Sequence, residues 1–471
     1  MARLFCERDN GMTSNRLGDI DIVMNKKGSL QFRKVSFPIR YGLFSEIQTE
    51  DHTFHVNLNG QIKWVRGNGK KWPHPSEWLK RTAGGDWVYY SAGRYSGTFD
   101  FIGEYYLPCL PYRSNPLIGA ADPFNDPAVP RALDAWRHLP EKIKPLISED
   151  LPPELKDFLE KIVANRPENP NPENPNPENT NPENPTPENS TPENTKKTSR
   201  LISDVNGARI SVLPPDARHV DYEVIPVIIG DGCLYNCGFC AVKSGRDFSV
   251  RTNENIFRQI NELKTVYGQE IKNSAAVFLG LHDSLAAGIE PIRFAAETAW
   301  DRFDFKHSNM TGGAFMFLFA SVDSLLGADE TLFAALERLP FFTYINIGLE
   351  SPDPATLDAL KKPVRAKDVE RAFDRMLDIN RRFRQIEISA NLVLGPHLPD
   401  SHFPSCVRLL EKKLSGFYSK GTLYMSPLLL SNSGNNDPAQ ARKAKKKTLD
   451  QFLTIKRLKK LETLLYLIQR L

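Results

Sequence analysis

The segment from residue 222 to residue 430 alternates apolar strand patterns with amphipathic helix patterns, and this alternation constrains the fold more than any other feature. Strands are expected at 223–230, 274–280, 314–321, 344–350, 386–395 and 422–430. Between them, apolar residues recur at helical spacing, as in Ile256, Ile260 and Leu263, with Thr252 available as an N-cap. Six consecutive strand–helix units predict an α/β domain in which helices cover the outer face of a parallel sheet.

A low-complexity tract separates this segment from the beginning of the chain. Pro-Glu-Asn recurs every five residues between residues 167 and 194, and proline blocks both helix and sheet. The tract therefore predicts a disordered, semi-extended linker over residues 166–200.

Residues 1–165 have a different pattern. Short strand patterns at Phe54–Leu58, Ile62–Val65 and Trp87–Ser91 are separated by turn signals such as Asn59-Gly60. One or two helices are expected over 130–163, with Leu-Pro breaks at 139–140 and 151–153. These patterns predict a smaller, β-rich N-terminal domain with trailing helices.

The core α/β domain is expected over residues 201–440, and the basic segment 441–471 follows it. That segment carries ten Lys or Arg residues against two acidic residues, which leaves the rest of the chain mildly acidic. One helical stripe accommodates its apolar residues, so we expect a basic amphipathic helix with lysines outward: Leu449, Phe452, Leu453, Leu461, Leu465 and Ile468. Binding to nucleic acid stays open as an alternative, although no RNA-binding module is recognisable.

A loop directly after the first strand carries three cysteines, spaced Cys233-x3-Cys237-x2-Cys240. Three thiolates this close can hold three irons of a [4Fe–4S] cluster, which leaves the fourth iron open for chemistry. A structural zinc normally takes four ligands, and the remaining cysteines are distant in sequence. A redox pair of Cys237 and Cys240 would leave Cys233 unexplained. Zinc and redox interpretations remain open beside the cluster.

The cysteine spacing, with Phe239 before the last cysteine, resembles the radical S-adenosylmethionine (SAM) superfamily. The resemblance covers roughly residues 222–430 and implies a partial, six-stranded (β/α)6 barrel. It implies that the open iron chelates SAM and that an electron from the cluster cleaves SAM into methionine and a 5′-deoxyadenosyl radical. This radical then removes a hydrogen atom from a substrate, which the sequence does not identify. The implied cofactors are a [4Fe–4S] cluster and SAM, and the implied partner is a reductant such as flavodoxin or ferredoxin.

The active site of an α/β barrel lies at the C-terminal ends of its strands. The resemblance implies that Phe239 lies near the SAM adenine. Gly280 ends the second strand, where the family often has a Gly-Gly-Glu-Pro-like segment, but His282 and Asp283 replace the acid here. Asp283 could accept a hydrogen bond from the SAM ammonium group, or it could cap the following helix.

The fourth strand places Asn346, Gly348 and Glu350 on one face by alternation, so these residues should line the barrel. The sequence Gly-Leu-Glu-Ser at 348–351 resembles the fourth-strand motif of the family, which implies SAM contacts for Glu350 and Ser351. The following residues, 353–363, strengthen the likeness.

The fifth strand carries Asn391 and ends at Gly395, which resembles the family's region near adenine. The alternative is a hydrogen-bonded polar layer inside the barrel without direct SAM contact. Weaker candidates at other strand ends are Ser321, Asp323, Tyr424 and Ser426.

Two rival functions are carried alongside the radical SAM enzyme. One is an RNA-modifying member of the same superfamily, and the other is a non-catalytic iron–sulfur binding or sensing module. No secretory signal and no run of about 18 apolar residues is visible, so we expect a cytoplasmic protein without a membrane span. Cys406 lies on an apolar helical face, which favours a core thiol.

Overall fold

The computed structural model describes most of the chain outside the Pro-Glu-Asn tract. The described residues are 7–9, 12–28, 42–70, 72–73, 78–81, 87–91, 101–106, 126–165, 202–208, 210, 212–220, 224–240, 245–310, 313–428, 438–458 and 460–466. The expected linker over 166–200, Cys6 and Cys109 lie outside these residues.

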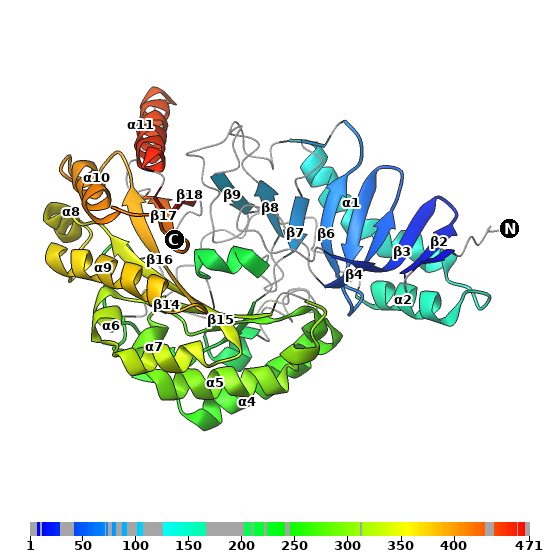
Figure 1. The fold of residues 1–471 in the computed structure, drawn as a ribbon. Helices are drawn as coiled ribbons and strands as arrows, with labels where there is room; N and C mark the ends of the chain where they lie inside the picture. Colours follow the sequence, from blue (N-terminus) through cyan, green and yellow to red (C-terminus); the bar gives the residue numbers. More distant parts are fainter. Residues whose placement is uncertain are drawn as a thin grey trace, which may run out of the picture.

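A parallel sheet forms the larger part of the molecule (Figure 1). Its strands lie in the order β10, β13, β14, β15, β16, β17, β18, and each pair of neighbours is parallel. Their bounds are Ile225–Val227, Ala276–Leu279, Ala314–Ala320, Phe341–Glu350, Ile386–Leu394, Thr422–Pro427 and Glu462–Tyr466. The first six confirm the predicted strands, and the α/β class with a parallel sheet is confirmed.

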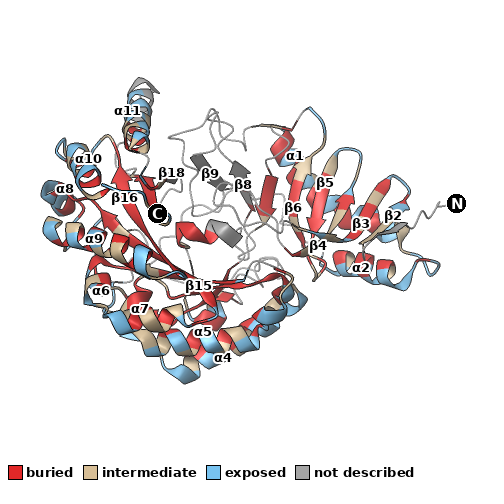
Figure 2. Ribbon diagram, in the orientation of Figure 1, coloured by how far each residue is buried: buried red, intermediate tan, exposed pale blue. Residues whose placement is uncertain are grey.

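Helices cover the outer face of this sheet, buried on the side that faces the strands and exposed on the other (Figure 2). They are α4 (Asn253–Tyr267), α5 (Ile289–Arg302), α6 (Val322–Gly327), α7 (Glu330–Glu337), α8 (Pro354–Ala359), α9 (Ala366–Arg382) and α10 (His402–Lys413). The predicted cap is confirmed, because the Thr252 side chain accepts a hydrogen bond from the Asn255 amide. The apolar stripe of α4 is buried, as its spacing predicted.

The end of the chain differs from the expected single helix. Helix α11 spans Pro438–Arg457, but the chain then turns and adds β18 as a seventh parallel strand in the described sheet. Leu461 and Leu465 therefore do not continue the helical stripe of Phe452. Their spacing suits a helix, yet a short apolar run buried in a sheet has the same composition, so periodicity could not separate the two.

The N-terminal part is an antiparallel sheet with two helices against one face. Its strands β1 to β9 span Glu7–Asp9, Met12–Leu17, Ile20–Lys27, Leu43–Gln48, His52–Val56, Ile62–Gly67, Trp78–Arg81, Trp87–Ser91 and Phe101–Tyr106. Helices α1 (Ala128–Ile143) and α2 (Pro153–Ala164) close its hydrophobic core. Pro140 lies inside the last turn of α1, so the expected break at 139–140 is wrong, whereas Pro153 does begin α2.

Two connections join the antiparallel and parallel sheets. Strand β9 pairs in parallel with β18, so one sheet runs continuously through both parts. A second seam involves Asn273, whose side chain bonds both the amide (2.9 Å) and the carbonyl (2.8 Å) of Leu43. Nearby, Asn59 donates to the Tyr267 carbonyl at 2.8 Å. Among the described residues, no helix combines the length and apolar character that crossing a bilayer requires.

Candidate active site

A pocket opens where the first strands of the parallel sheet end, with about 950 Å³ of empty space that is partly open to solvent. This location is the one expected for an α/β sheet, because loops at the carboxyl ends of parallel strands converge there. Its lining residues are Val212, Cys233, Tyr235, Cys237, Phe239, Cys240, Leu281, His282, Asp283, Phe319, Ala320, Ser321, Asn346, Gly348, Glu350, Lys362 and Asn391.

The three cysteines belong to one loop, and all three line the pocket. Gly232 turns the chain into this loop with a φ of 78°, and a Cβ there would meet the Asp247 carbonyl oxygen at 2.1 Å. Further along, the Gly238 amide donates to the Leu360 carbonyl at 3.0 Å. The Cys233 amide also donates to the Arg246 carbonyl at 3.4 Å, so backbone hydrogen bonds hold the loop at its first cysteine and between its last two.

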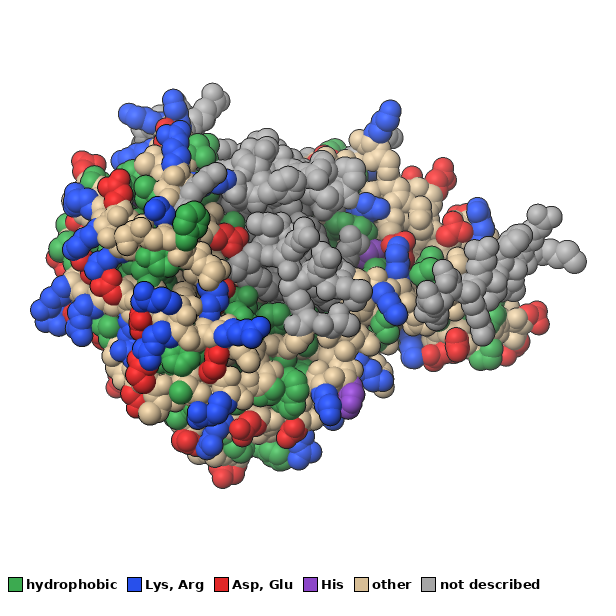
Figure 3. Space-filling view, viewed as in Figure 1, with side chains coloured by type: hydrophobic (Ala, Val, Ile, Leu, Met, Phe, Trp, Pro, Cys, Tyr) green, Lys and Arg blue, Asp and Glu red, His purple; other side chains and the backbone are tan. Residues whose placement is uncertain are grey.

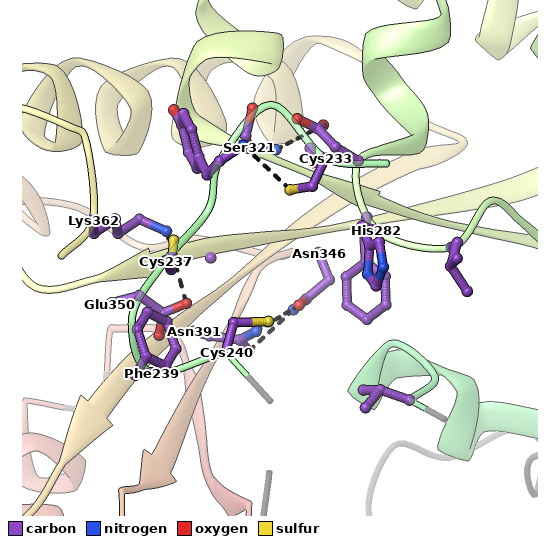
Figure 4. A pocket seen from close by; sticks show the side chains of 17 residues that line it. Cys233, Cys237, Phe239, Cys240, His282, Ser321, Asn346, Glu350, Lys362 and Asn391 are labelled. Carbon is purple, nitrogen blue, oxygen red and sulfur yellow. Dashed lines mark hydrogen bonds and ion pairs between the residues drawn. The ribbon is translucent and has the colours of Figure 1, made fainter. Parts of the chain in front are cut away.

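The three sulfurs lie on different sides of the pocket (Figure 4). The described residues contain no group of three His, Cys, Asp or Glu side chains close enough for a single metal ion. Burial raises the pKa of Cys233 and Cys237 above the usual thiol range, and the Lys362 ammonium opposes that shift at both. The thiols therefore surround the space and do not converge on one point.

Asp283 is almost fully buried at the edge of the pocket. Its Oδ1 accepts hydrogen bonds from the Ser321 amide at 3.0 Å and from the Ser324 hydroxyl at 2.7 Å. Its Oδ2 is buried and has no hydrogen-bond partner among the described residues. The alternative of a helix cap is wrong, because Asp283 makes no side-chain cap bond to the short 3-10 helix Ser284–Ala287 that follows. Burial raises the pKa of this carboxyl.

Glu350 reaches the pocket through an irregularity in β15. The pairing with β16 shifts register between Gly348 and Glu350, and Glu350 has a φ of 63°, which is rare for a residue with a side chain. Strict alternation therefore stops before Glu350, although its carboxylate still lines the pocket. The Lys362 ammonium lies 3.9 Å from Oε1 of Glu350, and both side chains are nearly inaccessible to solvent. Strained backbone of this kind clusters at functional sites.

A hydrogen-bonded network fixes the chain immediately after Glu350. Nε2 of His402 lies 2.8 Å from the Val393 carbonyl, which only accepts, so this nitrogen carries the proton. Nδ1 of the neutral ring then accepts from the Ser351 hydroxyl at 2.8 Å. Ser351 is fully buried in this network and does not line the pocket.

Asn346 and Asn391 form a buried amide pair on neighbouring strands. Asn391 Nδ2 donates to Asn346 Oδ1 at 2.7 Å, and Asn346 Nδ2 donates to Asn391 Oδ1 at 3.2 Å. Both residues also line the pocket. Asn391 therefore belongs to the hydrogen-bonded polar layer, which was one alternative. It also lines the pocket, as the alternative of a SAM contact requires.

Several predicted residues lie elsewhere. Gly280 has a φ of 128°, and a Cβ there would meet the Ser284 Oγ at 1.7 Å, so its role is in the turn. Gly395 lies against the Leu428 carbonyl and outside the pocket lining. Of the weaker candidates, Ser321 lines the pocket, whereas those outside its lining are Asp323, Tyr424 and Ser426. Cys406 is buried in α10, which confirms the prediction of a core thiol.

Two functional candidates were missed by sequence reasoning. Lys362, which follows helix α8, is only 7% exposed, and its Nζ lies 5.2 Å from the centre of the Tyr235 ring in the cysteine loop. Lysine is rarely buried unless it is paired, and the residues next to Lys362 in sequence do not reveal a partner. The sequence therefore gave no reason to place Lys362 in a pocket. Tyr235 lies between the first two cysteines, and nothing in the sequence marks it as functional. In the structure its hydroxyl accepts a hydrogen bond from the Asp323 amide at 3.0 Å.

Comparison with known families agrees with this location. The family model described as the radical SAM superfamily matches residues 227–410, a range that holds the cysteine loop and the four strand ends discussed above. No match was found among curated protein sequences.

Solved structures with partial similarity include three enzymes. A radical SAM methyltransferase from Sphaerobacter thermophilus is 15% identical with a TM-score of 0.31, and the match covers 52% of this chain and 66% of that one. Methylornithine synthase (PylB) is 13% identical with a TM-score of 0.32, covering 56% and 78%. The cobalamin-dependent enzyme OxsB is 12% identical with a TM-score of 0.32, covering 50% and 30%. The family match thus identifies residues 227–410 of this chain as similar to the radical SAM superfamily.

Proposed function

We propose that this protein is a radical SAM enzyme in which Cys233, Cys237 and Cys240 hold three irons of a [4Fe–4S] cluster. Members of the superfamily normally bind such a cluster and SAM. The donor set supports the assignment, because thiolates are the ligands that iron–sulfur clusters take and all three face one pocket. When bound, the cluster supplies the electron that cleaves SAM reductively. The raised pKa values of Cys233 and Cys237 describe the metal-free thiols, which a cluster would deprotonate.

The observation that carries the proposal is the unpartnered Oδ2 of Asp283 in the pocket that the cysteines line. A buried polar atom without a partner is costly and marks a place where a ligand completes the hydrogen bonding. A carboxylate oxygen suits the ammonium group of an amino acid, which is the end of SAM that the open iron would hold. Asp283 is therefore proposed to accept from the SAM ammonium group.

The pair of Lys362 and Glu350 supports the same ligand. A zwitterion needs a cation as well as an anion nearby, and Lys362 is a buried cation at the same pocket. We propose that Lys362 neutralises the SAM carboxylate and that Glu350 holds Lys362 in place. Phe239 and Asn391 are proposed to contact the rest of the SAM molecule. Ser351, Gly280 and Gly395 are proposed to shape the backbone of the site without contacting SAM.

We propose an N-terminal domain over 1–165, a linker over 166–200, a core domain over 201–440 and a C-terminal segment over 441–471, whose strand β18 extends the core sheet. The reductant is proposed to be a small electron carrier such as flavodoxin or ferredoxin. On the face drawn in Figure 3, acidic and basic side chains are interspersed over the helices of the core, and this charge pattern does not favour an RNA partner.

The test is product analysis of anaerobically reconstituted, dithionite-reduced protein incubated with SAM. We expect 5′-deoxyadenosine and methionine from the wild type, and neither product from a variant with Cys233, Cys237 and Cys240 all replaced by serine. The control is Cys406→Ala, which should keep both the cluster absorbance and the cleavage. Cleavage retained in the triple variant would overturn the proposal. A wild-type cluster whose EPR spectrum is unchanged by SAM would instead favour the non-catalytic iron–sulfur module.

A further inference from the structure

The chain segment that precedes the first parallel strand reaches the inner face of the sheet. A short 3-10 helix, η4 (Pro215–Val220), carries Asp216, which is completely buried. In Figure 1 it is the short green helix on the inner side of the sheet, across from the outer layer of helices. Asp216 accepts hydrogen bonds from the Ser389 hydroxyl on β16 at 2.5 Å and from the Tyr424 hydroxyl on β17 at 2.8 Å.

The hydrogen bond to Ser389 continues into the amide pair at the pocket. Asn346 Nδ2 donates to the Ser389 Oγ at 2.9 Å, and Asn346 in turn pairs with Asn391. A chain of four side chains therefore runs from η4, which the core domain of the family model does not include, to the pocket lining. All four are at most 1% exposed, so water does not compete with these bonds.

The direction of every bond in this chain follows from its first bond. The Ser389 hydroxyl donates to Asp216, so its single proton is used in that bond. Ser389 Oγ can then only accept from Asn346, which requires Nδ2 and not Oδ1 of Asn346 on that side. Asn346 consequently presents Oδ1 to Asn391, and Asn391 must answer with Nδ2.

The orientation of the Asn391 carboxamide is thereby fixed. One N–H of Nδ2 and one lone pair of Oδ1 are left after the pairing with Asn346. A reversed carboxamide would exchange donor and acceptor at these two positions, so a ligand built for one arrangement would meet like groups in the other. Which ligand edge Asn391 can recognise thus depends on a residue outside the pocket.

We propose that Asp216 is a positioning residue that sets the donor and acceptor pattern of Asn391 in the ligand site by acting through Ser389 and Asn346. This inference rests on the proposed function, because it takes SAM as the ligand that Asn391 contacts. A further bond to Asp216, from the Tyr424 hydroxyl, anchors the carboxyl group and is not part of the chain of side chains that leads to Asn391.

The experiment measures SAM affinity by anaerobic titration calorimetry and by the SAM-induced change in the cluster EPR spectrum. Asp216→Asn replaces the acceptor-only group with one that also donates, and Ser389→Ala interrupts the chain. Each is expected to weaken SAM binding roughly tenfold, the effect of about 1.4 kcal/mol. The double variant should bind no more weakly than Ser389→Ala alone, because the two residues act along one path. Tyr424→Phe removes a bond of Asp216 that lies outside this chain of side chains, and it should change the affinity less than about twofold if the effect passes through Ser389.

The outcomes separate this inference from the proposed function. Equal loss of affinity in Tyr424→Phe and Ser389→Ala would overturn it, since that result describes a structural anchor. Unchanged SAM affinity in both Asp216→Asn and Ser389→Ala would also overturn the inference about Asp216. The proposed function would then stand, because the wild type still binds SAM. A wild-type protein that carries its cluster and fails to bind SAM overturns the proposed function and this inference together.

Discussion

The Ser351 hydroxyl donates to Nδ1 of His402 at 2.8 Å, and this bond holds the backbone directly after the strained Glu350. The network continues from Ser351 to the Asp353 amide, which donates to the Ser351 Oγ at 3.0 Å. Helix α10, which carries His402, therefore stabilises the end of β15 through side chains that do not line the pocket. An unfavourable φ persists only where surrounding contacts determine it, and this network supplies such contacts.

The state of His402 leads to a pH prediction. Burial lowers the pKa of His402 below its usual value of about 6.5, so the unfolded chain binds the proton more tightly than the folded one. Stability from the neutral ring is therefore fully present above about pH 6.5 and is lost as the pH falls below it. We expect His402→Gln to destabilise the protein by roughly 1–3 kcal/mol at pH 7.5 and by less at pH 5.5.

Denaturant titrations at the two pH values would check this prediction. Because other histidines also titrate, the quantity to compare is the difference between wild type and variant at each pH. A difference that stays constant from pH 7.5 to pH 5.5 would mean that His402 does not titrate in this way.

Asp283 provides a prediction about ligand binding. Asp283→Asn can keep an acceptor towards the Ser321 amide and the Ser324 hydroxyl, but it places an N–H₂ group where the unpartnered Oδ2 lies. An amide donor facing the SAM ammonium should weaken binding at least tenfold, while cluster content and thermal stability stay close to wild type. Anaerobic SAM titration with iron analysis measures both.

The matched control for Asp283 is Ser324→Ala, which removes one of its hydrogen-bond donors and leaves the carboxylate. This variant should reduce stability by about 1 kcal/mol and retain SAM binding within a few-fold. SAM affinity that is untouched in Asp283→Asn would remove Asp283 from the proposed site.

The pair of Glu350 and Lys362 leads to a stability prediction. Glu350→Gln removes the carboxylate 3.9 Å from a buried ammonium, and breaking a buried pair from one side costs about 3–5 kcal/mol. Glu370→Gln is the control, because its pairing with Lys412 is exposed and should be worth less than about 1 kcal/mol. Chemical denaturation of both variants compares their losses in the free energy of unfolding. Equal losses would show that the buried Glu350–Lys362 pair stabilises the protein no more than an exposed pair does.

Much of the core and the cysteine loop could be predicted from sequence because each depends on local patterns. The buried stripe of α9, for example, follows from the spacing of Val369, Phe373 and Met376, all of which are buried. The three cysteines needed only their spacing to be placed in one loop.

The missed features depend on contacts between distant segments. Asp216 acts on Ser389 across 173 positions of sequence, and no periodicity connects them. The partner of the buried Lys362 is Glu350, which follows a register shift in β15 that the sequence pattern does not reveal. The alternation rule correctly placed Asn346 but could not foresee that β15 shifts register before Glu350. Strand β18 was missed because a five-residue apolar strand and a helical turn share their composition.

The seam between the two parts of the molecule gives the last prediction. Asn273 is nearly buried, and its carboxamide satisfies both backbone groups of Leu43 at the start of β4. Asn273→Ala leaves that N–H and C=O without this partner, and in a partly buried seam each unsatisfied group costs at most about 1–3 kcal/mol. The loss falls at the junction, so we expect β4 to open more readily while the core around α4 and α5 stays protected.

Hydrogen–deuterium exchange resolves where the protection is lost. Amides of Leu43–Gln48 should exchange faster in Asn273→Ala, with little change in β14 and β15. Asn261→Ala is the control, since its side chain donates to the Phe257 carbonyl in its own helix at 3.0 Å and makes no bond across the seam to any described residue. Uniformly faster exchange in both parts would mean that the seam is not a separate cooperative boundary. Unchanged exchange in β4 would mean that other contacts, such as the Asn59–Tyr267 bond and the β9–β18 pairing, hold the N-terminal sheet against the core without Asn273.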